Sequence, residues 1–426
     1  MGSKGGSFFT EVTHTASTIT FTFEDGTSIT LKRQTTPPAS PTLEITDAKA
    51  GTNAVEENTS RDFTLSQANV ESLTIIKPDG WQATVSGNTL TVTAPDTKNP
   101  YAEETGTVTL IGLSASGQAA TVSMTVGAGI AYTRGDGSFL DVLVKNPDLV
   151  KPNNDGTGEP IKLDGDGDGF ILLSDAARVK WIDVWDQGLT SLSGLAYFPA
   201  LESLNCSDNN LTGTLDVSGC ENLRTLLCDT NPNLSGLDVS GCENLQRLDC
   251  GGNANLSTLD VSGCENLQDL RCYNTDLSTL DVSNCESLQE LRCSNTKIDA
   301  LDVSDCVNLQ RLYCSWNPNL STLDVSGCGN LQTLECSNSA LTGTLDVSTC
   351  TGLEFLECGN FDENEADPKL TVTVAGGTDL VTSDEPGKLY VRVCYDNGNG
   401  WSFKDYGDMT AIGTVVSGVK VELKAP

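Results

Sequence analysis

The stretch LQRLDCGGNANLSTLDVSGC (residues 245–264) decides the fold, because close copies of it recur along the chain. Another copy, LQELRCSNTKIDALDVSDC, spans residues 288–306. A fixed period of 21 or 22 residues is typical of a solenoid, in which each coil buries its apolar face by stacking on the next. We therefore predict one short strand per coil over residues 179–360. A first unit without the cysteine opens at Val179, and eight full units open at Leu201, Leu223, Leu245, Leu267, Leu288, Leu309, Leu331 and Leu353.

Fifteen of the sixteen cysteines fall on two ladders with this period. We expect them to point inward, where cysteine packs as a small apolar side chain. Disulfide or metal chemistry is the alternative, but the repeats contain no C-x-x-C motif and no histidine. The sequence therefore favours reduced, packed thiols. One ladder is Cys206, Cys228, Cys250, Cys272, Cys293, Cys314, Cys336 and Cys358, and the other is Cys220, Cys242, Cys264, Cys285, Cys306, Cys328 and Cys350.

Two rows of polar residues follow the same period. Three residues after the first cysteine stands a side chain that can bond to turn backbone inside the coil. Each LDVS segment also carries an aspartate, which we interpret as bonding to the turn around the following serine. A row of bound cations is the alternative for these aspartates. The first row is Asn209, Asn231, Asn253, Thr275, Thr296, Asn317 and Ser339, and the second is Asp216, Asp238, Asp260, Asp281, Asp302, Asp324 and Asp346.

The composition excludes several classes of function. The chain of 426 residues has a net charge of −33, from 58 acidic and 25 basic residues. This field opposes binding to nucleic acids and to anionic membrane surfaces. The single histidine, His14, argues against a histidine base or a multi-histidine zinc site. No apolar stretch is long enough to span a bilayer, and the start MGSKGGSFF lacks the pattern of a signal peptide.

The residues before the repeats divide into three parts. Residues 1–41 hold one hairpin pattern, with a turn at Asp25-Gly26, and the linker QTTPPASP. Residues 42–128 carry about seven short alternating segments, which is typical of an immunoglobulin-like β-sandwich. Trp81 is expected in its core. Residues 129–178 are expected to form a helical cap, with one helix over 139–150 and a calcium-like loop.

That loop has the spacing D-x-D-x-D-G-x-I-x-x-x-D, which predicts a structural Ca²⁺. A glycine at the sixth position makes the turn. The final carboxylate is an aspartate rather than the usual glutamate. The alternative is a Gly/Asp turn without an ion. The predicted ligands are the carboxylates of Asp164, Asp166, Asp168 and Asp175 and the carbonyl of Phe170.

Residues 361–426 depart from the period and read as a β-rich C-terminal cap. The chain is thus predicted to be multidomain and mainly β. An immunoglobulin-like β-sandwich is followed by a solenoid with an EF-hand-like cap before it and a β-rich cap after it.

The repeat unit resembles the cysteine-ladder leucine-rich repeats of internalin-like surface proteins, as found in Bacteroidetes and Listeria. The unit L-x-x-L-x-C-x-x-N-x-L-x-x-L-D-V-S and the acidic loop before the first repeat carry this resemblance, over about residues 139–360. Residues 42–128 resemble, less closely, the BACON-type β-sandwich modules of Bacteroides-type surface proteins. The second cysteine stands where that family usually has asparagine. The resemblance implies a secreted, extracellular protein anchored to a cell surface, by a lipid or otherwise, with no catalytic residues.

The outward positions of the predicted sheet gather arginine and exposed aromatic residues in the central coils. Elsewhere the same positions are small or acidic, as at Thr225/Leu227 and Glu335. Arginine, tyrosine and tryptophan are common anchors at interfaces. The alternative is a set of solvated cross-strand ion pairs, each of small energetic value. The candidate ligand-binding residues are Arg247, Arg271, Tyr273, Arg292, Arg311, Tyr313 and Trp316.

These patterns predict a non-enzymatic recognition or adhesion protein that binds a protein partner, on a host or a cell surface, through the sheet face of the leucine-rich repeats. The alternative is a glycan-binding accessory protein of a surface polysaccharide-utilisation system. We expect a monomer without a membrane span, whose lipid anchor, if it has one, lies outside this sequence. Plentiful carboxylates allow a glycosidase pair on composition alone, but the acidic residues follow the repeat period.

Overall fold

A computed structural model describes most of the chain, and the described residues form two compact units, 1–130 and 131–426. Strands dominate both units, so the protein is mainly β. The described residues are 11–14, 18–22, 27–32, 40–49, 52–56, 59–95, 105–165, 167, 169–362, 369–375, 380–381, 389–396, 401–405, 415–416 and 419–423.

The first unit holds three small sheets. The predicted hairpin pairs β2 (Thr18–Thr22) with β3 (Ser28–Lys32), and β1 (Glu11–His14) lies beside β2. The turn at Asp25-Gly26 lies outside the described residues. One further sheet has the order β4-β6-β9-β8, and the other has β11-β10-β7 with β5 parallel to β11. Their bounds are β4 Thr42–Ile45, β5 Thr52–Glu56, β6 Ser60–Ala68, β7 Ser72–Ile76, β8 Gln82–Ser86, β9 Thr89–Thr93, β10 Thr105–Leu113 and β11 Ala119–Ala131.

Alternation along these strands buries one side of each sheet, as in β9, where Leu90 and Val92 are buried and the residues beside them are half-buried. Trp81 is fully buried, together with Phe63 and Leu90. Trp81 is therefore a packing residue of this unit. The immunoglobulin-like identity of the unit stays a prediction.

The second unit begins with a helix that is shorter than the predicted 139–150. Helix α1 spans Phe139–Lys145, and a separate 3-10 turn covers Pro147–Leu149. Pro147 lacks the N–H that an α-helix would require at this position, so the helix ends before it. Ser138 caps the helix by accepting a hydrogen bond from the Asp141 N–H, at 3.4 Å.

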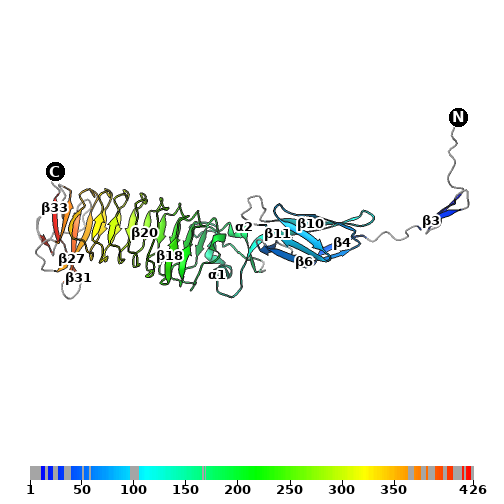
Figure 1. The fold of residues 1–426 in the computed structure, drawn as a ribbon, viewed down its shortest axis with the longest axis horizontal. Helices are drawn as coiled ribbons and strands as arrows, with labels where there is room; N and C mark the ends of the chain where they lie inside the picture. The colour runs from blue at the N-terminus through cyan, green and yellow to red at the C-terminus, as the bar shows by residue number, and fades with distance from the viewer. Residues whose placement is uncertain are drawn as a thin grey trace, which may run out of the picture. The chain divides into compact units, whose positions relative to one another are not determined.

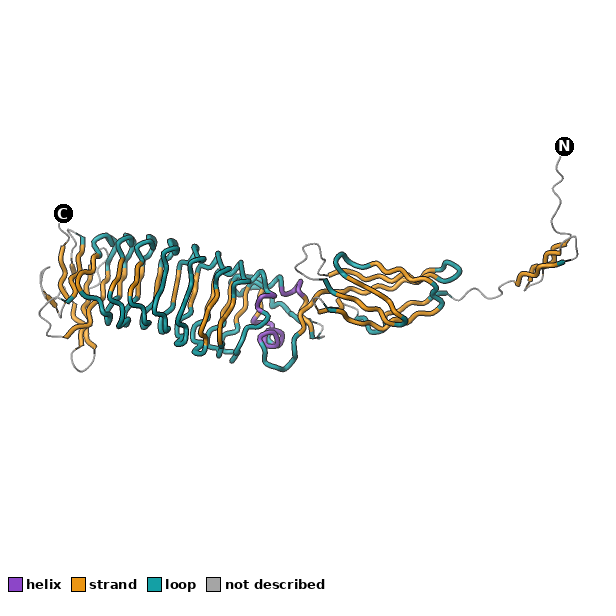
Figure 2. The backbone as a smooth tube through the Cα atoms, in the orientation of Figure 1, coloured by secondary structure: helices purple, strands orange, loops and turns teal. Residues whose placement is uncertain are grey.

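The repeats build one long, mainly parallel sheet with one short strand per coil, as predicted, and these strands are three residues long from β14 to β25. Figures 1 and 2 show these coils stacked in chain order. From β14 to β30 the strands pair in parallel, and β12 is antiparallel to β14. In order across the sheet, the strands are β12 Val150–Lys151, β14 Trp181–Asp183, β15 Ser203–Asn205, β17 Thr225–Leu227, β19 Arg247–Asp249, β20 Asp269–Arg271, β21 Glu290–Arg292, β23 Arg311–Tyr313, β25 Thr333–Glu335, β27 Phe355–Asp362, β30 Leu389–Asp396 and β29 Leu380–Val381, while β31 Trp401–Asp405 pairs with β30.

The central residue of each repeat strand and the cysteine that follows it point into the core. Leu248 and Cys250 are both fully buried, and so are Leu291 and Cys293. All sixteen cysteines are buried and none is in a disulfide. Cys328 donates a hydrogen bond from Sγ to the Val303 carbonyl at 3.1 Å. The thiols thus fill the interior of the coils.

Buried amides hold successive coils together, as the sequence predicted. Asn317 is fully buried, and its Nδ2 donates to the carbonyls of Cys293, at 3.0 Å, and Cys314, at 2.8 Å. Its Oδ1 accepts from the N–H of Thr296 at 2.7 Å. The LDVS aspartates make the predicted turns, since Asp324 accepts a hydrogen bond from the Ser326 N–H at 2.9 Å.

The LDVS segments form a second, discontinuous row of strands. The pairs β16–β18 and β22–β24 are separate two-stranded sheets, whereas β26 pairs in parallel with β28, and β28 pairs with β33. Residues beyond the last repeat therefore continue both rows of strands. The bounds are β16 Gly213–Asp216, β18 Leu234–Asp238, β22 Ala300–Asp302, β24 Thr322–Asp324, β26 Gly343–Asp346, β28 Leu370–Val374, β32 Val415–Val416 and β33 Val419–Leu423.

Candidate functional site

The outward face of the long sheet carries two rows of side chains, one on each side of the buried central leucines. Because the strands pair in parallel and in register, equivalent residues of successive coils lie side by side. One row reads Asn205, Leu227, Asp249, Arg271, Arg292, Tyr313, Glu335, Glu357 and Arg392, and the other reads Ser203, Thr225, Arg247, Asp269, Glu290, Arg311, Thr333, Phe355 and Tyr390.

Arg271 lies at the centre of an ion-pair network on this face. Its Nε and Nη2 donate to the two carboxylate oxygens of Asp269, both at 3.0 Å. Its guanidinium also approaches Glu290 at 3.5 Å and Asp249 at 4.0 Å. Burial would lower the pKa of Arg271, but the hydrogen bonds to Asp269 raise it overall. The guanidinium is thus a fixed cation in a bidentate pair.

The neighbouring coils extend the network. Arg292 Nε donates to Glu290 Oε1 at 2.5 Å, and Arg311 Nη1 reaches Glu290 Oε2 at 3.5 Å. The Arg292 guanidinium also stacks over the Tyr313 ring, 4.5 Å from its centre. Burial would raise the pKa of Glu290, but the hydrogen bond from Arg292 lowers it overall.

Arg247 and Tyr273 lie at the N-terminal side of the network. Arg247 Nε is 3.6 Å from Asp269 Oδ2, and this buried nitrogen makes no hydrogen bond. Tyr273 packs its ring against Gly251, where a Cβ would lie only 2.6 Å from the ring. Burial raises the pKa of Asp249 and of Tyr273.

The structure thus brings together six of the seven candidate residues, Arg247 through Tyr313, in coils β19 to β23. Trp316 lies in the turn after β23, and 47% of its surface is exposed. The ion-pair alternative describes the geometry of the arginines, because each one is within 4.0 Å of a carboxylate. Ion pairing does not account for the aromatic residues. Ligand binding by these seven residues stays a proposal.

The sequence analysis did not place Arg392 on this face, and it placed Glu335 and Glu357 there without making them candidate site residues. Arg392 lies over three rings, those of Phe355, Tyr390 and Phe403, with its guanidinium carbon 5.4–5.6 Å from each centre. Glu335 and Glu357 lie side by side on β25 and β27. The repeat period identifies Glu335 and Glu357 as neighbours, but Arg392 lies beyond the periodic region, so no sequence signal places it there.

The acidic loop curls around the carboxylate of Asp164. This group accepts hydrogen bonds from the N–H of Gly167 at 2.8 Å and of Gly169 at 3.2 Å. It also accepts from Tyr132 Oη and Arg134 Nη2, each at 2.7 Å. Burial would raise the pKa of Asp164, but the bonds from Arg134 and Tyr132 lower it to about 2.

The elements after this loop have the order expected of a calcium loop. Strand β13 (Phe170–Leu172) follows the glycine turn, and α2 (Leu173–Ala176) carries Asp175, which is 3.2 Å from Arg178. Asp166 and Asp168 lie outside the described residues. Among the described residues no three potential ligands gather. Arg134 supplies a positive charge at Asp164, and a cation in this loop stays a proposal.

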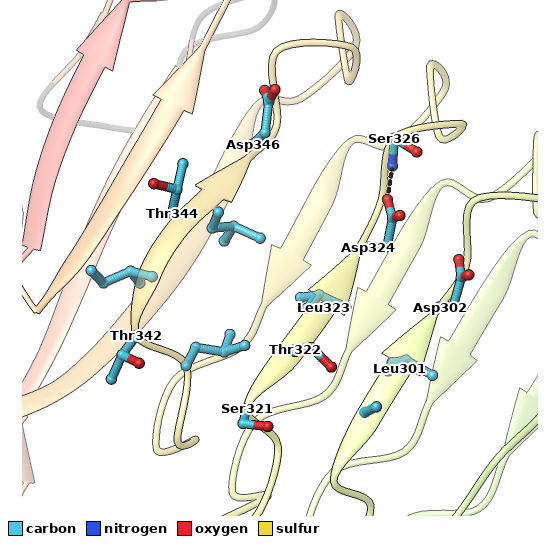
Figure 3. Close-up of a pocket in the computed structure, with 14 residues that line it drawn as sticks. Leu301, Asp302, Ser321, Thr322, Leu323, Asp324, Ser326, Thr342, Thr344 and Asp346 are labelled. Carbon is cyan, nitrogen blue, oxygen red and sulfur yellow. Dashed lines mark hydrogen bonds between the residues drawn. The ribbon is translucent and has the colours of Figure 1, made fainter.

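A groove of about 480 Å³ lies on the LDVS side, between β24 and β26. Figure 3 shows Thr322 and Leu323 from β24, Thr342 and Thr344 from the neighbouring coil, and Asp302, Asp324 and Asp346 at one end. The coil of β26 has one more residue between its two leucines than the coil of β24. The β26 coil reads Leu341-Thr-Gly-Thr-Leu345, whereas the β24 coil reads Leu320-Ser-Thr-Leu323. Gly343 takes φ +81° at this insertion. The same insertion in Leu211-Thr-Gly-Thr-Leu215 leaves β16 paired with β18 across a register shift, so the insertion alone does not separate β24 from β26.

Comparison with known proteins found no matching family model and no matching curated protein. Among solved structures, a leucine-rich repeat protein of Leptospira interrogans is similar at 23% identity, with a TM-score of 0.35. The match covers 43% of this chain and 56% of that one. Internalin C2 of Listeria monocytogenes is similar at 17% identity and a TM-score of 0.37, over 54% of this chain and 99% of that one.

The functional domain of InlJ from Listeria monocytogenes, which includes a cysteine ladder, is similar at 19% identity and a TM-score of 0.20. That match covers 60% of this chain and 93% of the other. In the parts of the chain that the structure describes, no helix is long and apolar enough to cross a membrane. The solved neighbours of this solenoid thus include internalin-type leucine-rich repeat proteins.

Proposed function

We propose that this chain is a non-enzymatic recognition protein that binds a protein partner through the outward face of its long sheet. The observation that carries the proposal is the gathering of four arginines and two tyrosines on β19 to β23 and the residues just after them. Arginine and tyrosine bury well and form directional contacts at interfaces. Three carboxylates lie among them, so a protein surface with mixed charges complements this face better than a uniformly charged polymer.

The same proposal includes an extracellular location at a cell surface and a monomeric state. The long sheet supports the binding face, since strands β14 to β30 pair in parallel and present one continuous surface to a partner. A glycan ligand in place of a protein is an outcome that the following test distinguishes.

Replacing Arg271, Arg292 and Tyr313 together by alanine is expected to abolish partner binding. The change removes the centre of the network and its stacked ring. It should leave the melting temperature nearly unchanged, because partly exposed ion pairs contribute about 0–1 kcal/mol each. The measurement is binding of the full chain to an array of purified extracellular proteins and to an array of glycans.

The matched control is Arg224→Ala. Arg224 is half-exposed and 3.4 Å from Glu202, away from the network. Protein ligands that the triple variant loses and the control retains support the proposal. Binding that survives the triple substitution, or that is confined to glycans, contradicts it.

We also propose a structural Ca²⁺ in the acidic loop, held by the carboxylates of Asp164, Asp166, Asp168 and Asp175 and the carbonyl of Phe170. The glycine turn at Gly169 and the hydrogen bonds around Asp164 support this proposal. The ion would stiffen the segment between α1 and the first coil.

Calcium added to the chelated chain is expected to bind one ion per chain and to raise its melting temperature. Binding to the folded state at 100 times the dissociation constant contributes about 2.7 kcal/mol. Titration calorimetry and thermal unfolding measure both effects. Asp164→Asn should abolish them and Asp260→Asn, an equal charge change in an LDVS turn, should not. An absence of heat after chelation would refute the site.

A further inference from the structure

Trp316 occupies a backbone position that other coils give to small or polar residues. The residue two after each strand cysteine from Cys206 to Cys336, or after Val184, has a left-handed backbone. Asparagine and glycine adopt this conformation readily, whereas it is strained for a bulky side chain. Trp316 has φ +63° and is 47% exposed. The equivalent residues are Asp186, Asp208, Thr230, Gly252, Asn274, Asn295 and Asn338, with φ between 51° and 71°.

The tryptophan thus combines a strained backbone with a large exposed apolar surface. Neither property favours folding, because burial of the ring is incomplete and asparagine would fit the turn better. A role in contact with a partner accounts for both. The choice of partner chemistry comes from the charges that surround Trp316.

The next two coils place two carboxylates side by side with no arginine or lysine on their own strands. Glu335 is in register with Tyr313 on one side and with Glu357 on the other, and Glu357 is followed in register by Arg392. Their strand neighbours on this face are Thr333 and Phe355. Among the described residues neither glutamate forms an ion pair within 4.0 Å, unlike Asp269 and Glu290 in the network.

Like charges directly opposite each other on a sheet destabilise it. Burial, and then the neighbouring Glu357, raise the pKa of Glu335. Arg292 and Arg392 lower the pKa of Glu335, but burial and Glu357 outweigh them. The carboxylate pair is therefore only partly compensated, and an added cation would stabilise it further.

Hydrogen bonds connect Glu357 to the turn of Trp316. Ser337 Oγ donates to Glu357 Oε1 at 2.6 Å, and the Ser337 N–H donates to Ser315 Oγ at 3.1 Å. Ser315 directly precedes Trp316, whose N–H donates to the Ser337 carbonyl at 2.9 Å. The turn that carries Trp316 is therefore hydrogen-bonded to the turn that contacts Glu357.

We propose that Trp316, Tyr313, Glu335 and Glu357 form a subsite for a basic side chain, lysine or arginine, of a protein partner. This inference rests on the proposed function, and it adds the chemistry of one contact. The carboxylates neutralise the cation while the rings cover its aliphatic part and attract its charge. The Arg292–Tyr313 stack on the same face is an internal example of a cation held by one of these rings.

The test is selection of a random twelve-residue peptide library on the immobilised full chain at physiological salt. Lysine and arginine are expected to be enriched in the recovered pool. This enrichment should be lost with Trp316→Asn and with the double variant Glu335→Gln, Glu357→Gln. The charge-matched control Glu221→Gln, Glu243→Gln, which changes two exposed glutamates after the LDVS cysteines, should retain it.

Trp316→Asn has a second expected result that a structural role would not produce. Because asparagine suits the left-handed turn, the melting temperature should rise by roughly 2 °C or more while the enrichment is lost. A lower melting temperature with undiminished enrichment would overturn the proposal.

The remaining outcomes separate this subsite from the wider binding face. Enrichment lost only with the Arg271, Arg292 and Tyr313 triple variant overturns the subsite and leaves the proposed function standing. A pool without basic enrichment, or one that no face variant changes, also overturns the subsite. If no variant of this face changes the recovered pool, the proposed binding face is contradicted as well.

Discussion

Raising the pH from 8 to 10 under reducing conditions is expected to unfold the repeat array. Burial raises the pKa of every ladder thiol, to about 11 for Cys220 and Cys264 and to about 12 for Cys293 and Cys358. In the unfolded chain a cysteine ionises near pH 8.5. The unfolded state therefore loses protons that the folded state keeps, and the folded state loses stability as the pH rises.

Proton linkage gives the direction and the size of this loss of unfolding free energy. Stability from these thiols is fully present below about pH 8.5 and declines as the pH rises toward the folded pKa values. Once the unfolded form is ionised, each thiol lowers the free energy of unfolding by about 1.4 kcal/mol per pH unit. Fifteen ladder thiols together give about 20 kcal/mol per pH unit, more than the about 5–15 kcal/mol that stabilises an ordinary domain.

Circular dichroism and denaturant unfolding between pH 7 and 10 measure this loss, and return to pH 7 with reductant should restore the fold. A variant with Cys220, Cys242, Cys264 and Cys285 changed to alanine is the control. Its slope should be smaller by about 5 kcal/mol per pH unit, because four fewer protons are released. Stability that does not change over this range, or an equal slope in the variant, would show that the thiols are not packed as described.

Replacing Asn317 by alanine is expected to cost about 3–5 kcal/mol of unfolding free energy. The change leaves the buried carbonyls of Cys293 and Cys314 and the N–H of Thr296 without their partner. Each unsatisfied buried group costs about 1–3 kcal/mol. The loss is measured by the shift of the urea midpoint.

The matched control is Asn319→Ala, two residues away in the same coil. Asn319 is exposed and its Nδ2 donates one long bond, of 3.3 Å, to the Lys297 carbonyl. Its removal should change the unfolding free energy by about 0.5 kcal/mol or less. Similar effects of the two substitutions would contradict the role of the buried amide ladder.

Much of the candidate site followed from the period. Because Leu291 and Cys293 must point inward, Glu290 and Arg292 must point outward, and the same holds in every coil. The sequence therefore predicted which residues share the face. It did not predict that Glu290 would contact three arginines, since diagonal contacts depend on side-chain conformations.

Other parts depended on structure outside the repeat. The helix predicted over 139–150 ends at Lys145, although Pro147 was visible in the sequence as a helix breaker. The three rings around Arg392 come from β27, β30 and β31. Two of these strands lie beyond the period, so periodicity carried no information on their register.

The sequence by itself determined the coils, the inward cysteine ladders and the set of outward residues. It could do so because stacking repeats one local environment at a fixed spacing. Equivalent positions of successive coils therefore lie next to one another. The tertiary structure alone decided the backbone conformation of Trp316 and the pairing of each charge. Those depend on how one turn closes and on which side chains reach across strands, and neither follows from spacing.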